Sequence, residues 1–567
     1  MRQPGRRDRS LQLVLAALLA LPLLAAFFGG GGFADVYGAY QSGVGPATVA
    51  RQLALAAALG RSLLIGVLAA ALAAALGVPA GWALAQTPHP ASTSFMSGLL
   101  RKGRGTVAAL VLAALPLALP PSVAVSGWVG LLAPAGAASR FNVPIPGFGP
   151  ESRGWLFSSL GAAFVLGLSF WPVVALEVWP AFKRARASSA YDAALLYGSR
   201  SRSFWRVVLP QARGELASGA LLVFLLASSD FTVSSLLLVR TLPIEIHDAL
   251  ASGRTASAAW AAVPLLIMVF AVAALLYWRT PSPCPLPAGE RAGGSGARAP
   301  VGTAFLSAGV LLGFLVPMLV CLQQALAGGK PMTRVFGAGS EALLVSLRLA
   351  GAAAALAAVL AVLRAVLWPE MRARALNAAA LFLLAAPGSF LAAAVLAVQV
   401  SCTGTLTPYE GNALAEAVLA GLPAAALTFG YVVRFIYLPL RLVEEGLAGL
   451  DPEMLDAAAL SGHGRISRGV AIALPLVAAH VAAAAALVFV LVLGEVAMAD
   501  KLHPPGVTPA TVWLFQQQHL GYDEAVFGLS LLLGAVAAAA LLVAGLLVTG
   551  LSTLFGRVNG GGDAAGA

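Results

Sequence analysis

DAALLYGSRSRSFWRVVLP at residues 192–210 and DAAALSGHGRISRGVAIALP at residues 456–475 are two versions of one pattern. Each begins with Asp-Ala-Ala, has a glycine six residues after the aspartate, and ends on a proline preceded by apolar residues. Both are basic interruptions in an otherwise apolar chain. A long pattern that occurs twice predicts a chain with two halves built alike.

The composition predicts a membrane protein. Of the 567 residues, 59% are hydrophobic and 10% are charged, whereas soluble domains carry about 25% charged residues. Apolar runs of ~20 residues, enough for a helix to cross a hydrocarbon core of ~30 Å, recur along the whole length. No hydrophilic stretch is long enough to form a soluble domain. We therefore expect an all-α, polytopic transmembrane fold.

We expect about twelve spans, six in each half. They cover approximately residues 11–29, 60–85, 106–133, 155–180, 214–238, 257–278, 302–326, 342–366, 375–400, 412–437, 470–494 and 525–550. The run from Leu11 to Phe28 is interpreted as an uncleaved first span, because no small-x-small cleavage site closes it.

The basic residues predict the orientation. With the N-terminus inside, most of the 35 Lys and Arg fall in cytoplasmic segments, which is the usual bias of membrane proteins. Both termini and both Asp-Ala-Ala loops are then cytoplasmic, and the expected location is the bacterial inner membrane. The same bias accounts for the net charge of +11, so the lipid bilayer is the expected surroundings and nucleic acid is not an expected partner.

A Pro- and Gly-rich segment divides the chain. Residues 280–300, TPSPCPLPAGERAGGSGARAP, have no apolar period and are typical of a flexible linker, here on the cytoplasmic side. Residues 1–279 form the first predicted half and residues 301–567 the second. Because six spans return a chain to the same side of the membrane, we expect the halves to be a duplication in parallel orientation.

Spacings inside the halves agree with this duplication. Asp230 lies 20 residues after Pro210, and Glu495 lies 20 residues after Pro475. The segments that begin at Ser62 and Ser346 also resemble each other.

Each loop, near residues 187–214 and 450–476, is expected to form a short helix, a glycine turn and an amphipathic piece that leads to the next span. In the second loop Asp451 is a predicted N-cap, followed by Pro452 in the first helical position. Gly462 then ends the helix, since glycine takes the left-handed conformation at low cost.

In the first loop Ser189 is the predicted N-cap, with Asp192 three residues on in a pairing like a capping box. Gly198 is the predicted stop. The small Ala-Ala pair of each loop would let the groove of another protein approach the helix closely.

This arrangement resembles the "EAA" loop of bacterial ABC importer permeases (consensus EAA, three residues, G, nine residues, I-x-L-P). The matching residues are Asp192, Ala193, Ala194, Gly198 and Pro210 in the first copy, and Asp456, Ala457, Ala458, Gly462 and Pro475 in the second. The resemblance implies a fused two-half permease subunit of the type I importer fold, whose loops dock two copies of an ABC ATPase. Asp replaces Glu in both copies, and the first copy is one residue shorter between glycine and proline.

The chain has no ATPase motif of its own. A P-loop needs Gly-Lys followed by Ser or Thr, and none of the four lysines is followed by either residue. ATP and Mg are therefore expected on the partner, and this chain is expected to be neither an enzyme nor a holder of cofactors. H-E-x-x-H and G-x-S-x-G motifs and paired Cys or His clusters are also absent from the sequence, so no metal site is predicted.

Two acids are candidates for the translocation pathway, because polar groups in apolar spans are costly. Twenty helical residues rise ~30 Å, which places Asp230 and Glu495 near the outer face. There they could form an acidic mouth for a cation or anchor helix ends, and the sequence leaves both open. Four other polar residues near span ends are interpreted as anchors, namely Glu177, His480, Arg434 and Arg348.

Three further segments look like regions of the iron(III)-type permease group: Ala118 to Leu132, Ser229 to Leu242, and Leu493 to Tyr522. This resemblance implies a periplasmic binding protein that delivers ferric ion. Permeases for thiamine and 2-aminoethylphosphonate share the design and stay open as alternatives. A secondary transporter driven by an ion gradient is the rival class. His503 and His519 are interpreted as polar loop residues rather than metal ligands.

Overall fold

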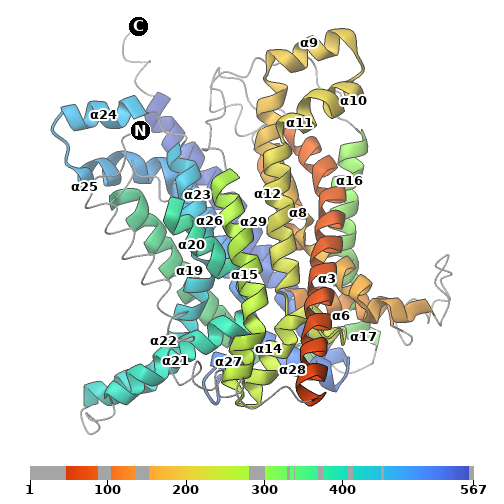
Figure 1. The fold of residues 1–567 in the computed structure, drawn as a ribbon. Coiled ribbons are helices and arrows are strands. Elements are labelled where there is room, and N and C mark those ends of the chain that lie inside the picture. Colours follow the sequence, from red (N-terminus) through yellow and green to blue (C-terminus); the bar gives the residue numbers. More distant parts are fainter. Residues whose placement is uncertain are drawn as a thin grey trace.

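The computed structural model describes residues 46–86, 104–133, 152–279, 300–327, 332–337, 339–367, 374–406, 413–448 and 452–560. Every regular element in these ranges is a helix (Figure 1), as the sequence predicted. The predicted first span at 11–29 and all but the last residue of the predicted linker lie outside the described residues.

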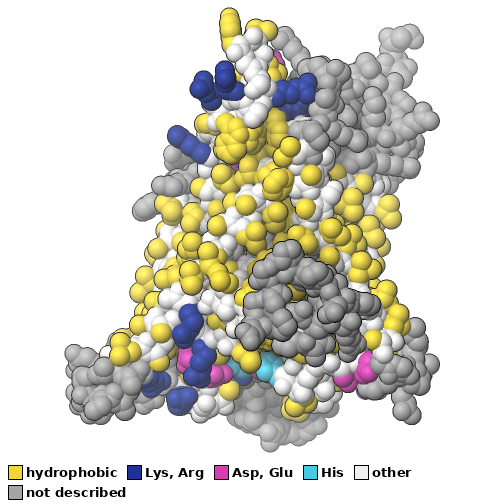
Figure 2. All heavy atoms as spheres, turned by 90° about the vertical axis from the view of Figure 1, so that its right-hand side faces the viewer, with side chains coloured by type: hydrophobic (Ala, Val, Ile, Leu, Met, Phe, Trp, Pro, Cys, Tyr) yellow, Lys and Arg dark blue, Asp and Glu magenta, His cyan; other side chains and the backbone are white. Residues whose placement is uncertain are grey.

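Seven helical stretches in the described ranges are long and apolar enough to cross a membrane. Their elements are α3 (Pro46–Ala85), α8 (Ser159–Arg186), α15 (Thr255–Arg279), α16 to α17 (Pro300–Val310 and Val316–Ala327, joined by the π-helix η4, Leu311–Leu315), α19 (Ser340–Leu367), α26 (Leu474–Leu493) and α29 (Glu524–Gly560). Figure 2 shows a broad apolar belt between two ends at which charged side chains gather, as expected for a membrane protein.

Three predicted spans are not straight. α5 (Arg104–Ala118) and α6 (Pro121–Leu132) meet at 78°, α20 (Arg374–Ala385) and α21 (Gly388–Leu406) at 110°, and α22 (Ala413–Phe435) and α23 (Tyr437–Ala448) at 46°. In the first two pairs the break contains Pro120 or Pro387, which lacks an N–H and restricts the residue before it. The predicted spans at 106–133 and 375–400 are therefore bent pairs, whereas the predicted span at 412–437 is α22, which bends at its end into α23.

The predicted span at 214–238 is shorter than expected. α12 (Arg213–Ser228) has 16 residues, fewer than the ~20 that cross a hydrocarbon core. The chain then turns at Asp230, whose carboxylate accepts hydrogen bonds from the N–H groups of Val233 and Ser234 in α13 (Thr232–Leu236). The acid thus ends one helix and begins the next.

The two predicted halves contact each other through several helices. α16, the first described helix of the second half, packs against α3 and α5 of the first, and α17 packs against α6. Close approach at one crossing requires Gly127, since a Cβ there would lie 2.5 Å from Cβ of Pro317. Buried polar bonds add to this interface: Gln518 in α28 (Ala510–Leu520) donates to the carbonyl oxygen of Ser122 in α6, at 2.9 Å.

Candidate functional site

The first Asp-Ala-Ala loop forms α9 (Ser189–Tyr197) and α10 (Arg200–Ser203) at one end of the bundle, which we call the coupling end (Figure 1). The N-cap is Ser188, whose hydroxyl accepts from the Tyr191 N–H, so the predicted N-cap Ser189 is one residue too late. Asp192 and Ala193 are exposed, and Ala194 is half-buried. Gly198 ends the helix as predicted, with extended backbone (φ −157°).

The second loop forms α24 (Pro452–Leu460) and α25 (Arg465–Arg468), also at the coupling end (Figure 1). Its predicted N-cap, Asp451, lies outside the described residues. Gly462 ends the helix in the left-handed region (φ +83°) as predicted. The His463 N–H bonds to the carbonyl of Ala458 and the Gly462 N–H to that of Ala459, the pattern of a Schellman motif. Asp456 and Ala457 are exposed, and Ala458 is half-buried.

Both loops present large apolar side chains to solvent at equivalent positions. Leu196 and Leu460, each four residues after the aspartate, are 81% and 90% exposed. Trp205 and Val470, each five residues before the proline, are 62% and 50% exposed. Several large apolar side chains exposed beyond the apolar belt indicate a protein-binding surface.

Each loop continues into the following helix through a π-helix in the same register. η3 (Phe204–Val208) and η6 (Gly469–Ala473) both span the sixth to the second residue before the proline. Pro210 and Pro475 then lie in the first turn of α11 (Leu209–Gln211) and of α26. The extra residue of the second copy falls in the turn after the glycine, because α10 and α25 have equal lengths.

Asp230 and Glu495 lie beyond the ends of α12 and α26 that are farther from the loops, and they have equivalent local roles. Val233 N–H donates to Asp230 Oδ2 at 2.8 Å, and Met498 N–H donates to Glu495 Oε1 at 3.0 Å. Each acid therefore accepts from the N–H three residues on, in the turn that leads into the next short helix.

Glu495 differs in having a buried cationic partner. Arg434 Nε lies 3.2 Å from Glu495 Oε2, and the two side chains are 13% and 10% exposed. The pair packs over Gly388, where a Cβ would lie 2.9 Å from Glu495 Oε1. Asp230 makes no ion pair with any described residue, although the charges of Glu495 and Arg434 reach it. The anchoring role predicted for Arg434 is therefore wrong: it is the counter-ion of a pathway candidate.

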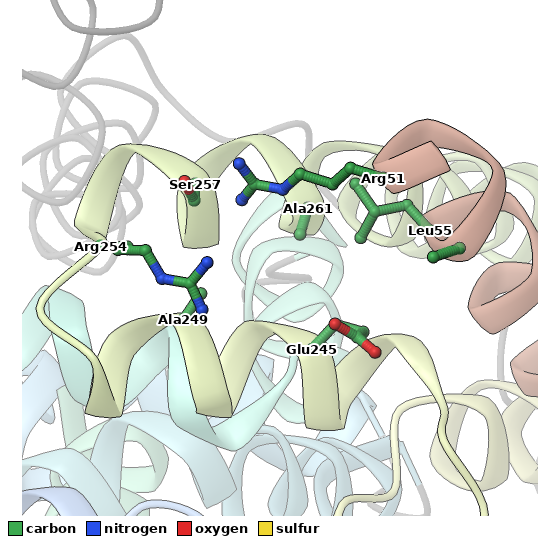
Figure 3. A pocket seen from close by; sticks show the side chains of 8 residues that line it. Arg51, Leu55, Glu245, Ala249, Arg254, Ser257 and Ala261 are labelled. Atoms are coloured by element: carbon green, nitrogen blue, oxygen red, sulfur yellow. The ribbon is translucent and has the colours of Figure 1, made fainter. Parts of the chain in front are cut away.

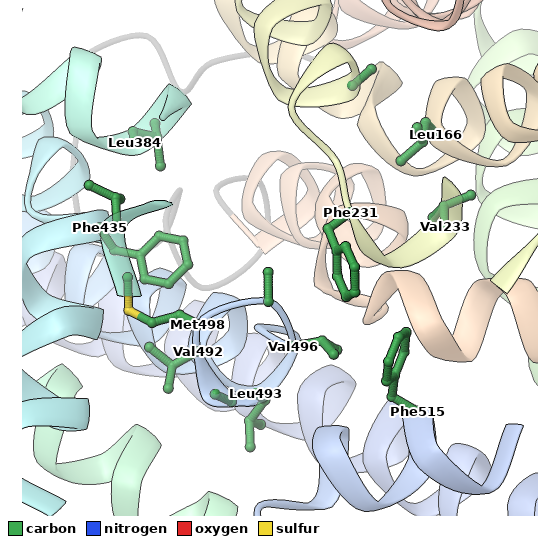
Figure 4. Packing of buried hydrophobic residues seen from close by; sticks show 14 of the residues in the cluster. Leu166, Phe231, Val233, Leu384, Phe435, Val492, Leu493, Val496, Met498 and Phe515 are labelled. Atoms are coloured by element: carbon green, nitrogen blue, oxygen red, sulfur yellow. The ribbon is translucent and has the colours of Figure 1, made fainter. Parts of the chain in front are cut away.

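The halves also meet in a polar and aromatic seam near these acids. His247 in α14 (Leu242–Ala251) lies 3.0 Å from Asp500 in α27 (Ala499–Leu502). Phe231 stacks on His247 with ring centroids 4.2 Å apart, and it contacts Phe515 across the seam at 5.3 Å (Figure 4). Burial alone would raise the pKa of Asp500, but the hydrogen bond with His247 and the charge of Lys501 lower it to about 2.

The sequence interpretation missed this seam. His519 was assigned to a loop, whereas it lies in α28 with Nε2 3.4 Å from the Ser235 hydroxyl of the first half. Local sequence patterns cannot predict this contact, because Ser235 and His519 are 284 residues apart. The sequence does indicate a polar site in this region, because several His, Asp and Lys residues lie between the last two predicted spans.

Comparison with known proteins gives one relationship of limited extent. No family model matches the chain. Over 118 residues, 21% of this chain, it is 29% identical to the "Putative ferric transport system permease protein FbpB 1" of Haemophilus influenzae. The match covers 18% of that relative. This chain is therefore similar to a transport permease over about a fifth of its length.

Proposed function

We propose that this chain is the membrane-spanning subunit of an ATP-driven importer of the ABC type, with both permease halves in one polypeptide. The observation that carries the proposal is the equivalence of the two loops at the coupling end. Each presents an exposed leucine at the same position and passes through a π-helix in the same register to a proline in the first turn of the next helix. Two equivalent docking surfaces fit two copies of one ATPase.

Equivalent contacts elsewhere support a duplicated architecture of twelve spans, in halves 1–279 and 301–567. The Ser62 hydroxyl accepts from the first N–H of α14 at 3.0 Å, and the Ser346 hydroxyl accepts from the first N–H of α28 at 2.7 Å. Both halves also bend a predicted span at a proline. Two halves of unrelated origin would not be expected to repeat these bonds at equivalent positions.

The mechanism we propose joins the two ends of the molecule. ATP and Mg would bind to the ATPase pair, whose closing would move α9 and α24 and, through η3 and η6, the helices α12 and α26. Those helices end at Asp230 and Glu495, beside the seam between the halves. Opening that seam would expose the pathway to a periplasmic binding protein. ATP can shift this equilibrium only through contacts that differ between the two states.

Ferric ion is the cargo that we propose first, because the relative found by comparison is named as a ferric transport permease. The Asp230 carboxyl, which makes no ion pair with any described residue, lies near the Arg434–Glu495 pair, and a carboxyl group without a counter-ion favours a cation as its ligand. Thiamine, a cation, and 2-aminoethylphosphonate are the alternatives. The inner membrane, with the coupling end in the cytoplasm, is the proposed location.

Charge placed on the docking surface tests the proposal. We expect the double variant Leu196→Asp, Leu460→Asp to lose co-purification with an ABC ATPase co-expressed from the same genome, because each aspartate would be buried in an apolar groove without a partner. Leu520→Asp is the matched control, since Leu520 is 82% exposed and follows the seam, away from the coupling end. Retention of the ATPase by the double variant at the level of the control would contradict the docking role.

A further inference from the structure

A small cavity lies between α3, α14 and α15, near the end of the molecule opposite the coupling end. Its volume is about 60 Å³, and its lining includes Arg51, Leu55, Glu245, Arg254 and Ala261. Figure 3 shows the side chains of Arg51 and Arg254 reaching into the space between the three helices from different elements. The cavity has room for a small polar group and is open to the surroundings.

The two arginines are free to bind a ligand. Neither Arg51 nor Arg254 has an ion pair or a side-chain hydrogen bond within the described residues. The one acid in the lining, Glu245, lies 3.6 Å from Arg240 outside the cavity. The lining therefore has two uncompensated guanidinium groups, whose planar donor sets suit the oxygens of phosphate.

The cavity lies at the depth of lipid headgroups. α15 has 25 residues and so rises about 37 Å, between the ~30 Å of the hydrocarbon core and the ~40 to 45 Å that includes the headgroups. Arg254 immediately precedes this helix. Trp260, six residues further on, is 60% exposed, as expected of the aromatic belt at a membrane interface.

Exposed apolar side chains continue from the cavity toward the centre of the membrane. On α15 these are Ile267 and Phe270, and on α3 they are Leu64 and Val67. An acyl chain could lie against them while its headgroup occupies the cavity. An acidic protein surface has no such apolar extension, so these residues favour a lipid.

We propose that this cavity binds the phosphate of an anionic phospholipid in the leaflet opposite the coupling end. The inference depends on the membrane location and not on the proposed transport function, so either can fail without the other.

Lipid binding to the purified full-length chain tests the proposal. Native mass spectrometry would compare phosphatidylglycerol with phosphatidylcholine for the wild type and for Arg51→Gln, Arg254→Gln. Each arginine contributes ~1 kcal/mol near an anionic surface, so we expect phosphatidylglycerol binding to weaken about thirtyfold in the double variant. The charge-matched control is Arg61→Gln, Arg348→Gln, which removes two arginines outside the lining and should change binding by less than about threefold. Thermal melting would confirm that all variants are folded.

Three results would overturn the proposal. Equal phosphatidylglycerol binding by the double variant and the control would show that the arginines do not form the site. Displacement of the lipid by millimolar inorganic phosphate would indicate a site for a free anion. Loss of binding-protein stimulation by the double variant in pure phosphatidylcholine nanodiscs would indicate that the arginines bind an acidic protein surface.

Discussion

Phe204 and Gly469 occupy the same position in the two halves, at the start of the π-helix six residues before the proline, yet they fix the loops differently. Phe204 packs in an aromatic cluster with Trp82 at 5.0 Å and Phe182 at 5.6 Å. Gly469 lies against the backbone of α19, where a Cβ would be 2.5 Å from Cα of Val366. The same π-helical backbone is therefore positioned by packed aromatic rings in the first loop and by close backbone contact with α19 in the second.

The ends of α12 and α26 near the seam also combine equivalent backbone geometry with different side-chain contacts. Asp230 and Glu495 accept equivalent backbone hydrogen bonds, but only Glu495 has a buried counter-ion. The two predicted halves therefore share backbone geometry at these positions, but their side chains have different partners. Equivalent substitutions should therefore have unequal effects.

The largest inequality is expected for the two acids. Glu495→Gln would leave Arg434 buried without a counter-charge and should cost about 3 to 5 kcal/mol. Asp230→Asn keeps an oxygen that can accept from the Val233 N–H and should cost ~1 kcal/mol or less. Thermal unfolding in detergent measures the difference. Adding Arg434→Met to Glu495→Gln should recover most of the loss, and no recovery would count against the pair.

A smaller difference in stability is expected between substitutions near the starts of the two π-helices. Gly469→Ala should force η6 and α19 apart and lower stability by about 1 to 3 kcal/mol. Ser203→Ala, in the preceding helix of the first loop, removes only a local hydroxyl bond to Ser199 and serves as the control. The melting temperatures of the two variants give the test, and equal values would contradict the close contact.

The glycines that end the two docking helices should differ by less. Gly462→Ala puts a side chain in the left-handed region at a cost of about 1 to 2 kcal/mol, whereas Gly198→Ala meets no such strain. If helix geometry controls docking, Gly462→Ala should weaken ATPase affinity about tenfold and Gly198→Ala by less than about threefold. Titration of the ATPase against both variants separates these outcomes, and the reverse order would be inconsistent with the two backbone conformations.

The smallest effect concerns acid sensitivity of the seam. The pKa of Asp500 is lowered to about 2 from its ordinary value of 3.8, so its ionised form stabilises the folded state above about pH 4. That contribution is lost as the pH falls from about 4 to 2. Asp500→Asn should remove this part of the pH dependence of melting. An unchanged profile would show that the contact with His247 adds no stability.

The sequence predicted the helical class, the seven membrane-capable helices of the described residues and both glycine stops, because these depend on apolar run length and local backbone preference. It did not predict the sharp bends at Pro120 and Pro387, since apolar composition is the same in straight and bent segments. Counting residues placed Glu495 just after a predicted span, as observed, but placed Asp230 inside the predicted span at 214–238, whereas α12 ends at Ser228. Arg434 and the His247–Asp500 contact could not be found this way, because tertiary packing determines these partners.

Transport by the reconstituted complex tests the central claim most directly. Proteoliposomes would contain this chain with or without the ABC ATPase, and ⁵⁵Fe³⁺ would be supplied on its binding protein. Our account predicts uptake that requires both the ATPase and ATP on the side of α9 and α24, and that is abolished by Leu196→Asp, Leu460→Asp. Uptake by this chain alone under an ion gradient would contradict it.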